Sequence, residues 1–462
     1  MPSETPTVQP PDPGILHISS QTEAEKIFVD WHPADIAETF ADLEEVEKDR
    51  FLSHLDEEMA QMLMGYLDDH ADAEMLLHHF PASQQREILE SIGDDDRVDF
   101  LQNSDDESRE HFLSVLSGDA KEQTESLLQF PEDSAGGRMT TEVATIGPEL
   151  TASEAFEELR SIAKEAEVLA RVYVVDDRNR LLGRLRLRDL IFAEQGKVIS
   201  EIMQSVRLTI DPLADQEEAA KMVQKYDLVT LPVVDENRTF LGCITHDDAV
   251  DILEQESTED IEQMAAISPA PEEVTYLETK IWTHLRRRFP WVLGLAFLAI
   301  VSGWVMIQFE AVLTGLFQLA LYLPMVVAAG GNTGGQASTM VIRAMSVGEL
   351  APSAFGQVLW KELRLGVFMG TALGLCIALQ ILVFLPGTPL PESVPTWLFG
   401  VAVAAALALQ VTTSTLIGAA LPLVAKACKI DPAVVASPAI TTLVDVSGLA
   451  IYFVIANAVL GI

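Results

Sequence analysis

The chain has 462 residues, 48% of them hydrophobic, and a formal net charge of −40 at pH 7. Such an acidic surface repels phosphates, which argues against a nucleic-acid-binding protein and favours cationic ligands. An acidic surface kept only for solubility or high salt is the alternative. The three cysteines, Cys243, Cys376 and Cys428, show neither pairing nor metal-ligand spacing, so we expect small apolar fillers in a reducing compartment.

The charge is distributed very unevenly along the chain. Residues 1–288 hold 64 of the 70 acidic and 25 of the 30 basic residues, whereas residues 289–462 hold six acids and five bases among long apolar runs. The length suggests about three domains of roughly 150 residues each. We predict a soluble part followed by a membrane domain. The N-terminal stretch lacks the basic and apolar regions of a secretory signal, so the soluble part is expected in the cytoplasm.

The first part of the chain is predicted to be helical. Residues 1–25 are rich in proline and polar residues, which is typical of a disordered tail. Over residues 26–135, apolar residues such as Ile36, Phe40 and Leu43 recur at helical spacing. The predicted helices are short and separated by turns, so we expect an all-α superhelical domain.

Acidic residues in this helical domain are a candidate cation contact. Asp95 and Asp99 lie four residues apart and share one face of a predicted helix. The run from Asp94 to Asp96 can equally be a helix start, because acids there complement the helix dipole. Both interpretations stay open from the sequence alone.

An internal repeat follows. Residues 171–191 and 230–250 align at an offset of 59, so that Asp176, Gly183 and Asp189 match Asp235, Gly242 and Asp248. Each copy has the pattern strand, turn, strand and acidic helix start. Residues 136–255 therefore resemble a tandem CBS pair, an α/β module that senses a small ligand.

The CBS resemblance implies a nucleotide contact at one of the two copies. In that family a Ser/Thr-x-x-Asp motif often contacts a nucleotide ribose. The second copy carries the motif as Thr245 and Asp248, whereas the first has Arg186 in place of the hydroxyl residue. ATP or another adenine nucleotide is thus an expected ligand at the second copy and is unsupported at the first.

A connecting segment over residues 246–288 begins with a very acidic helix. From Asp247 to Glu262 there are eight acids and no lysine or arginine, with apolar contacts at helical spacing. Like charges at this spacing repel one another. The helix is therefore either a solvated surface helix or a link between the sensor and the membrane whose charge is titrated by cations.

The last part, residues 289–462, is predicted to be an all-α membrane domain. Five apolar segments have membrane length: 290–309, 315–341, 362–385, 397–425 and 437–459. With five spans, the basic residues near the segment ends all fall on the side of the N-terminus. The positive-inside rule then places the N-terminal domains in the cytoplasm and the C-terminus outside the cell.

Two of these segments carry residues that a lipid-facing helix should not have. The second contains Gly331 and Asn332 within the sequence GGNTGGQ, and the fifth contains Asp445. An aspartate at mid-membrane costs about 2.5–3.5 kcal/mol and usually marks an ion or substrate pathway. Ser437, Thr441 and Thr442 add hydroxyl oxygens nearby, which suits a hard cation such as Mg²⁺ or Ca²⁺.

Five motifs together indicate a family. They are PEDSAGGRMT at 131–140, GGNTGGQ at 330–336, KELR at 361–364, DPAVVASP at 431–438 and TTLVDVSGLAIYF at 441–453. The chain resembles the MgtE family of magnesium transporters along nearly its whole length. The resemblance implies a helical N domain, a CBS pair, a connecting helix and five membrane helices. It also implies a homodimer in the cell membrane, with a pore between the second and fifth membrane helices of both subunits.

The resemblance also implies a role for particular residues. Asp445 matches the pore aspartate, and Ser437 lies where some members place an asparagine near the ion. High cytosolic Mg²⁺ would bridge acids of the soluble domains and hold the pore shut, and low Mg²⁺ would open it. The matching acids are Asp95, Asp99, Glu217, Asp227, Asp248, Asp251, Glu256, Glu259, Asp260 and, after the first membrane helix, Glu310.

Two other functions remain open from the sequence. One is a permease for another divalent cation, such as Mn²⁺ or Co²⁺, although the absence of Cys, His and Met around Asp445 disfavours softer metals. The other is a membrane-anchored CBS nucleotide sensor without transport. An enzyme is not expected, because the sequence shows no P-loop and no nucleophile–base pair.

Overall fold

The computed structural model describes residues 16–67, 69–162, 168–268, 276, 279–350, 352–384, 390–391, 394–435 and 437–461. The chain divides into two compact units. One comprises Met1–Glu256 with Glu272–Val274, and the other comprises Ser257–Pro271 with Thr275–Ile462.

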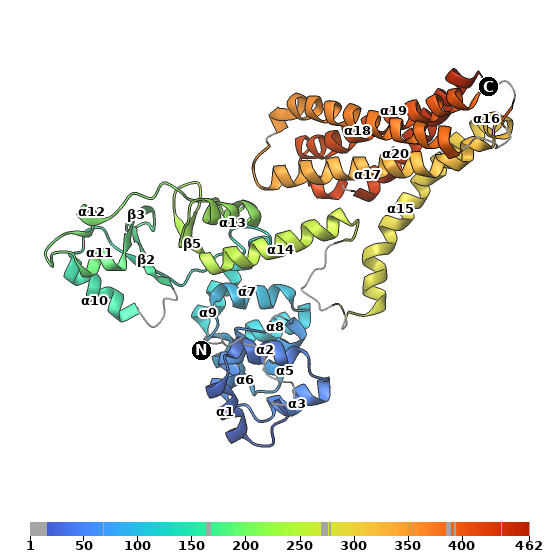
Figure 1. Cartoon of the computed structure of the whole chain (residues 1–462). Helices are drawn as coiled ribbons and strands as arrows, with labels where there is room; N and C mark the ends of the chain where they lie inside the picture. The colour runs from blue at the N-terminus through green and yellow to red at the C-terminus, as the bar shows by residue number, and fades with distance from the viewer. Residues whose placement is uncertain are drawn as a thin grey trace, which may run out of the picture. The chain divides into compact units, whose positions relative to one another are not determined.

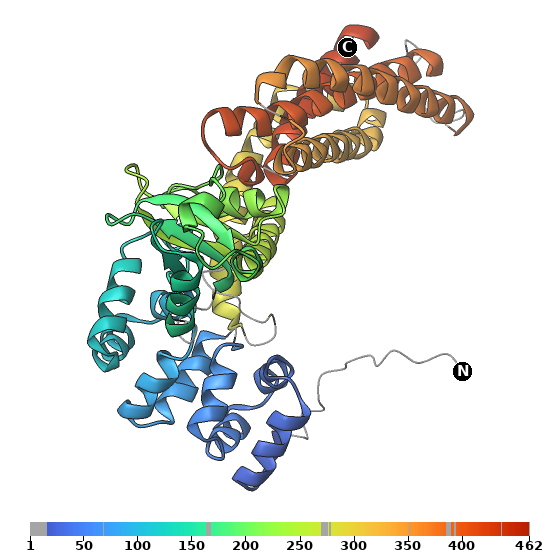
Figure 2. The ribbon, with the colours of Figure 1, turned by 90° about the vertical axis from the view of Figure 1, so that its left-hand side faces the viewer.

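The first unit begins with a stack of short helices, shown in blue in Figure 2. Aspartates begin several of them, since the side chains of Asp56, Asp69 and Asp105 accept hydrogen bonds from backbone N–H groups of the first turn. The helices bury one apolar face each, around Phe40 and Phe51. They are α1 (Gln21–Asp30), α2 (Pro33–Ala41), α3 (Glu45–Leu52), α4 (Glu57–Met64), α5 (His70–His78), α6 (Ala82–Leu89), α7 (Asp94–Asn103), α8 (Asp106–Val115) and α9 (Gly118–Leu127).

The predicted disordered tail over residues 1–25 is too long at its C-terminal end. Residues 1–15 lie outside the described residues, but α1 already begins at Gln21. Leu16 and Ile18 are buried in the same apolar core as α1. The proline-rich composition of the first residues therefore does not extend to this stretch, where apolar residues recur and can be buried.

The two CBS copies have the same local structure. The first copy has a three-stranded sheet in which β1 (Val143–Ile146) pairs in parallel with β2 (Val168–Val175), and β2 pairs antiparallel with β3 (Leu181–Arg186). The second has β4 (Thr230–Val234) antiparallel to β5 (Phe240–Thr245), with a parallel bridge from Ile210 to Val233 in place of the third strand. Their helices are α10 (Ala152–Ile162), α11 (Leu187–Ile191), α12 (Ile199–Ile202) and α13 (Gln216–Lys225).

The offset of 59 residues is visible in the turns of both copies. Asn179 and Arg238, 59 residues apart, both have a positive φ, 56° and 63°. Asp176 and Asp235 accept backbone hydrogen bonds within these turns. The Tyr173 hydroxyl makes a 2.7 Å hydrogen bond with Thr230 of the other copy. The two copies therefore form one module, as the repeat predicts.

The connecting helix and the membrane helices complete the chain. The acidic helix is α14 (His246–Met264), and five long helices follow among the described residues, with a short helix, α16, between the first two. These are α15 (Ile281–Gln308), α16 (Glu310–Gly315), α17 (Gln318–Ser346), α18 (Phe355–Phe384), α19 (Thr396–Ala427) and α20 (Ser437–Leu460), with 3-10 turns η2 (Pro352–Ala354) and η3 (Pro432–Val435).

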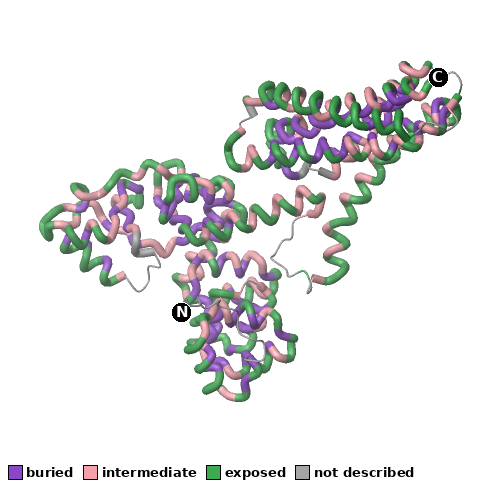
Figure 3. The backbone as a smooth tube through the Cα atoms, in the orientation of Figure 1, coloured by how far each residue is buried: buried purple, intermediate pink, exposed green. Residues whose placement is uncertain are grey.

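Four of the described helices are long and apolar enough to cross a membrane: α15, α18, α19 and Pro438–Leu460 of α20. The remaining predicted span, α17, has 29 residues but is less apolar because it contains GGNTGGQ. Figure 1 shows α17, α18, α19 and α20 running side by side, with α19 contacting the other three. Figure 3 shows α15 exposed along most of its length, whereas α19 is extensively buried.

Glycines allow α18 and α19 to approach closely. Gly366, Gly370 and Gly374 recur every fourth residue along the face of α18 that meets α19. A Cβ atom added at Gly370 would lie 2.5 Å from the backbone oxygen of Ala408. Such small residues are typical of helix interfaces within membranes, where van der Waals packing drives association.

We expect Gly370→Ala to destabilise the membrane domain by about 1–3 kcal/mol, the usual cost of overpacking. The added methyl group would meet backbone atoms of α19, which cannot move independently of that helix. Thermal unfolding in detergent measures the effect. Gly356→Ala on the same helix is the matched control, because nothing lies within 4 Å of its added Cβ atom. Equal melting temperatures for the two variants would contradict this packing.

Candidate ion pathway and regulatory sites

The structure brings together parts of the predicted ion pathway on α17 and α20. A Cβ atom built on Gly331 would lie 3.2 Å from the Cγ2 atom and 3.8 Å from the hydroxyl oxygen of Thr441. Gly334, one turn further along α17, faces Ile440 and Val444 in the same way. The glycines of this polar stretch let α20 lie directly against α17, which stays helical throughout.

The remaining pathway residues lie on exposed or half-buried positions of a single chain. Asp445 follows Thr441 by four residues, so both occupy one face of α20. Asp445, Thr441 and Thr442 are half-buried, and Asn332 is exposed on α17. The Thr442 hydroxyl donates to the Pro438 carbonyl at 3.0 Å, within its own helix. Ser437 is the first residue of α20, and its side chain lies outside the described residues.

One predicted regulatory acid of the first unit, Asp99, contacts an arginine that links several elements. Arg138, from the segment between the helical domain and the CBS pair, forms an ion pair with Asp99 of α7. It also donates hydrogen bonds to Gln216 of α13 at 2.9 Å and to Gln255 of α14 at 3.0 Å. One guanidinium group thus joins the helical domain, the second CBS copy and the middle of the connecting helix.

The carboxylate of Asp99 is only partly neutralised in this arrangement. Burial raises its pKa to about 6, and Arg138 opposes that effect. Its Oδ1 atom is buried and has no hydrogen-bond partner within the described part of the chain. Asp248 lies close enough to raise the pKa further. Asp99 is therefore a largely buried carboxylate that one arginine pairs only in part and that a second acid approaches.

In the Asp99→Asn variant, we expect the backbone amides of α7 to exchange hydrogen more slowly than in the wild type at pH 7.5 in Mg²⁺-free buffer. The raised pKa means that the charged carboxyl is disfavoured in the folded protein, so stability is lost as the pH rises through about 6. At pH 5 the wild-type carboxyl takes up a proton, and the difference should shrink.

Solvent screening limits the size of this effect, because 32% of the Asp99 side chain is exposed. The exposed Asp96→Asn on the same helix makes the same charge change and serves as the control. A protection pattern for Asp99→Asn that matched this control at both pH values would contradict the prediction.

Asp248 has a structural role that the sequence did not reveal. Its carboxylate accepts hydrogen bonds from the backbone N–H and the hydroxyl of Thr245, at 3.0 and 2.6 Å. The Thr245 hydroxyl in turn accepts from the Asp248 N–H. This reciprocal pair is a capping box at the start of α14. Burial raises the pKa of Asp248, and the hydrogen bonds from Thr245 oppose that shift.

The other predicted metal ligands are dispersed. Among them, Glu217 pairs with Lys221, Glu256 accepts a hydrogen bond from Gln216 at 2.6 Å, and Glu259 accepts one from Gln263. Asp95 on α7 and Asp260 on α14 are half-buried. The exposed ones are Asp227, which has a positive φ of 48°, Asp251, and Glu310 at the start of α16. Within the described residues no three His, Cys, Asp or Glu side chains are placed to hold a metal ion. The structure of one chain therefore does not assemble the predicted metal sites.

Asp94 is a buried anchor that the sequence analysis treated only as part of a helix start. Its side chain is fully buried and accepts hydrogen bonds from the Thr140 hydroxyl at 2.8 Å, the Thr141 N–H at 2.9 Å and Gln123 at 2.8 Å. It therefore joins the helical domain to the segment that leads into the CBS pair. No pattern in one sequence separates such a residue from its exposed neighbour Asp96.

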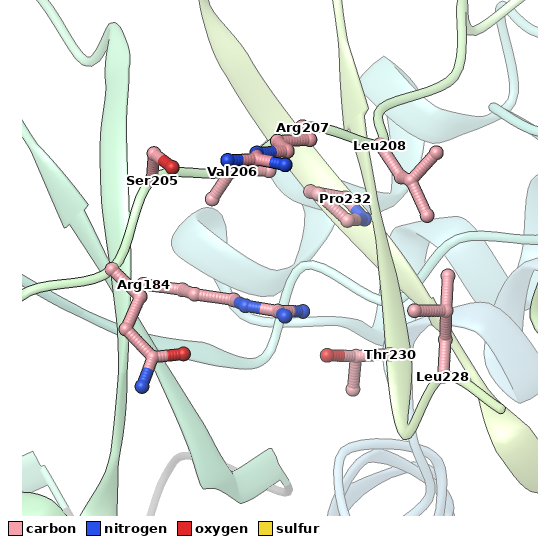
Figure 4. A pocket seen from close by; sticks show the side chains of 9 residues that line it. Arg184, Ser205, Val206, Arg207, Leu208, Leu228, Thr230 and Pro232 are labelled. Atoms are coloured by element: carbon pink, nitrogen blue, oxygen red, sulfur yellow. The ribbon is translucent and has the colours of Figure 1, made fainter. Parts of the chain in front are cut away.

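The predicted nucleotide contact at Thr245 and Asp248 does not coincide with a pocket found between described residues of the CBS module. That pocket has a volume of about 320 Å³ and is lined by Arg184, Gln204, Ser205, Val206, Arg207, Leu208, Leu228, Thr230 and Pro232. Figure 4 shows the guanidinium groups of Arg184 and Arg207 directed into it. In the first copy, Arg186 forms an ion pair with Asp189 at 2.6 Å.

The comparisons with known proteins agree along the chain. Residues 323–455 match the MgtE model, described as a divalent cation transporter. Residues 31–133 match the MgtE intracellular N domain, and residues 135–196 and 199–255 match the CBS domain.

Curated relatives extend the likeness to nearly the whole chain. The magnesium transporter MgtE of Bacillus subtilis is 31% identical over 92% of this chain and 91% of its own. The MgtE of Thermus thermophilus is 34% identical over 79% of both chains. A solved cytosolic domain of the Mg²⁺ channel MgtE in complex with ATP is 31% identical, covers 50% of this chain and 95% of its own, and has a TM-score of 0.48. With its helical N domain, CBS pair and apolar helices, the chain belongs to the MgtE family of magnesium transporters, which are transporters rather than enzymes.

Proposed function

We propose that the protein is a Mg²⁺-selective, channel-like transporter that takes up Mg²⁺ down its electrochemical gradient. The observation that supports this most is the carboxylate of Asp445 on an apolar helix, one turn from Thr441, where α20 lies against the glycines of α17. A charged side chain at membrane depth is costly, so one that is present usually marks an ion or substrate pathway. The carboxylate oxygens of Asp445 and the hydroxyl oxygen of Thr441 suit a hard divalent cation that keeps part of its water shell.

A homodimer would complete the pathway. Asp445 and Asn332 are not fully buried within one chain, so a second copy can face them. Two symmetry-related Asp445 residues would supply the two negative charges that balance one divalent cation. We therefore place the ion path between two copies of α17 and α20. Asp445, Ser437, Thr441, Thr442, Asn332 and Gly331 are its proposed lining residues.

Cytosolic Mg²⁺ would regulate this path through the acids of the soluble part. Asp99 and Asp248 approach one another beside Arg138, and further acids continue along α14. Near its end, Glu262 of α14 pairs with Arg287 of α15, so the acidic helix is joined to the first membrane helix. We propose that bound Mg²⁺ removes repulsion among these acids and favours a compact state with a shut pore.

Mg²⁺ flux into proteoliposomes that contain the full chain tests the proposal, with Mn²⁺, Co²⁺ and Ca²⁺ compared at the same concentration. We expect Mg²⁺ uptake without ATP, driven by the gradient alone, and lower uptake when Mg²⁺ is added on the cytoplasmic side. Faster passage of Mn²⁺ or Co²⁺ would favour a permease for those ions. No flux of any divalent cation would favour a sensor without transport and overturn the proposal.

The topology we propose has the N-terminal domains in the cytoplasm and the C-terminus outside the cell. Five spans separate the two ends, and the loop near Leu390 should face outward. Single cysteines introduced at 390 and at 429, after replacement of Cys243, Cys376 and Cys428, can be labelled with a membrane-impermeant reagent. We expect labelling from outside only at 390. Labelling only at 429 would invert the topology.

We also propose that the CBS pocket binds a phosphorylated ligand, such as ATP. Arg184 and Arg207 bring two positive charges into a pocket of an otherwise strongly acidic protein, and Ser205 adds a hydroxyl group. Calorimetric titration of the full chain with ATP tests this. We expect about tenfold weaker binding for Arg184→Gln, since hydrogen bonds to charged groups contribute about 1.5–3 kcal/mol. Arg178→Gln, in an exposed turn, is the control, and equal affinity for both variants would refute this role.

A further inference from the structure

Gln410 is a fully buried amide at the centre of the membrane domain. It lies on α19, and its Nε2 atom donates a 2.9 Å hydrogen bond to the backbone oxygen of Val444 on α20. Val444 immediately precedes Asp445. The amide therefore contacts the backbone of α20 one residue from the carboxylate of the proposed ion path.

Two glycines leave room for this amide. A Cβ atom added at Gly330 of α17 would lie 3.0 Å from the Cγ atom of Gln410. One added at Gly448 of α20 would lie 2.6 Å from its Nε2 atom and 2.9 Å from its Cδ atom. The two glycines therefore leave the space between α17, α19 and α20 that the Gln410 side chain fills. Any larger residue at either glycine would displace this side chain.

The amide also carries an energetic cost that packing alone does not explain. Its Oε1 atom is buried and has no hydrogen-bond partner among the described residues. A buried, unsatisfied polar atom destabilises a protein, so an apolar side chain of similar size would be expected here if only packing mattered. Apolar packing alone therefore does not account for an amide at this position.

The geometry indicates that the amide of Gln410 fixes the orientation of α20. Successive residues of a helix are about 100° apart around its axis, so holding the buried Val444 carbonyl toward α19 also sets the direction of Asp445. The Ser447 hydroxyl donates to the same carbonyl at 3.0 Å. We propose that Gln410 is a positioning residue for ion passage, and that its amide fixes the rotation of α20 and hence the position of Asp445.

This inference rests on the proposed transport function, so its test has a readout that does not depend on flux. Gln410→Met keeps the side-chain length but removes the donor. In a background without Cys243, Cys376 and Cys428, single Thr441→Cys and Val446→Cys substitutions report which faces of α20 a small thiol reagent reaches. We expect Gln410→Met to change the ratio of the two labelling rates by about threefold or more, the effect of a small reorientation.

Flux in proteoliposomes gives the second readout. Partners that orient an ion ligand typically contribute 10- to 100-fold, so we expect Gln410→Met to lower Mg²⁺ uptake by about tenfold or more. The Mg²⁺ concentration that gives half-maximal uptake should rise as well. If Gln410 had only a structural role, the variant would contain less folded protein, but this concentration would not change. The melting temperature should not fall, because the variant also removes an unsatisfied oxygen.

The matched control is Ser414→Ala, one turn further along α19. Ser414 is also fully buried, and its hydroxyl lacks a hydrogen-bond partner in the described part of the chain. Unchanged labelling ratios in Gln410→Met, or a loss of flux explained entirely by lower stability, would overturn the inference. If the wild type carried no Mg²⁺ but the labelling ratio still shifted, the proposed function would fail while the positioning role stood.

Discussion

Asp445→Ala should abolish Mg²⁺ flux while the protein still folds and assembles. The change removes the carboxylate that we place in the ion path, on a face of α20 that is half-buried in one chain. Even partners that only orient an ion ligand contribute 10- to 100-fold, so we expect the loss of the ligand itself to lower flux by more than about 100-fold. Asp445→Asn should have nearly the same effect, because it keeps the shape but not the charge.

Uptake into proteoliposomes, normalised to the amount of folded protein, measures this effect. Glu349→Gln is the matched control, since it removes one acid from an exposed position of the same unit. The melting temperature in detergent should stay the same or rise, because a charge at membrane depth is removed. Wild-type flux in a well-folded Asp445→Ala protein would show that the ion does not pass this carboxylate.

The features that could be predicted from the sequence are those whose residues are unusual for their segment or recur at a fixed spacing. Asp445 is conspicuous because an acid is rare in an apolar segment, and the CBS pair because Asp176 and Asp235 recur at a fixed offset. The structure confirms the repeat, down to the paired positive φ values of Asn179 and Arg238. The family and the fold class were predicted correctly from such motifs.

Residues whose importance lies in tertiary contacts could not be predicted in this way. Asp94 and Asp96 belong to the same acidic run, yet only Asp94 is buried against Thr140. Gln410 begins a short polar stretch in an apolar helix, but only the structure shows that its amide contacts the backbone beside Asp445. The position of the CBS pocket, away from Thr245 and Asp248, likewise depends on how the two copies pack.

The acids of α14 are the second place where we expect a large effect. Eight acids in sixteen residues lie on this helix, and Asp248 of its first turn approaches Asp99 of α7. Two like charges about 4 Å apart near a protein surface repel by about 4 kcal/mol at an effective dielectric constant of 20. Several such contacts are comparable to the free-energy differences that shift a two-state equilibrium almost completely.

We expect the triple variant Asp248→Asn, Asp251→Asn and Glu259→Gln to be inhibited less strongly by cytosolic Mg²⁺. Losing ligands weakens closure and losing repulsion favours it, but Mg²⁺ affinity depends so steeply on carboxylates that the first effect should dominate. Amides are chosen because the amide oxygen introduced at position 248 would still accept the capping hydrogen bonds from Thr245, so α14 should remain folded. We expect the cytosolic Mg²⁺ concentration that halves the flux to be about fivefold higher in the triple variant. This change corresponds to the lower end of usual coupling energies, about 1–3 kcal/mol.

Two measurements on the full chain check this expectation, namely the Mg²⁺ dependence of flux and the protection of α14 from protease by Mg²⁺. Both should weaken together, because the same bound ions are responsible for both. The control removes three exposed acids of the CBS pair that lie outside α14, with Glu158→Gln, Glu194→Gln and Glu201→Gln, and so changes the net charge equally. If the α14 variant kept the inhibition and the protection of this control, α14 would join the two units without sensing Mg²⁺.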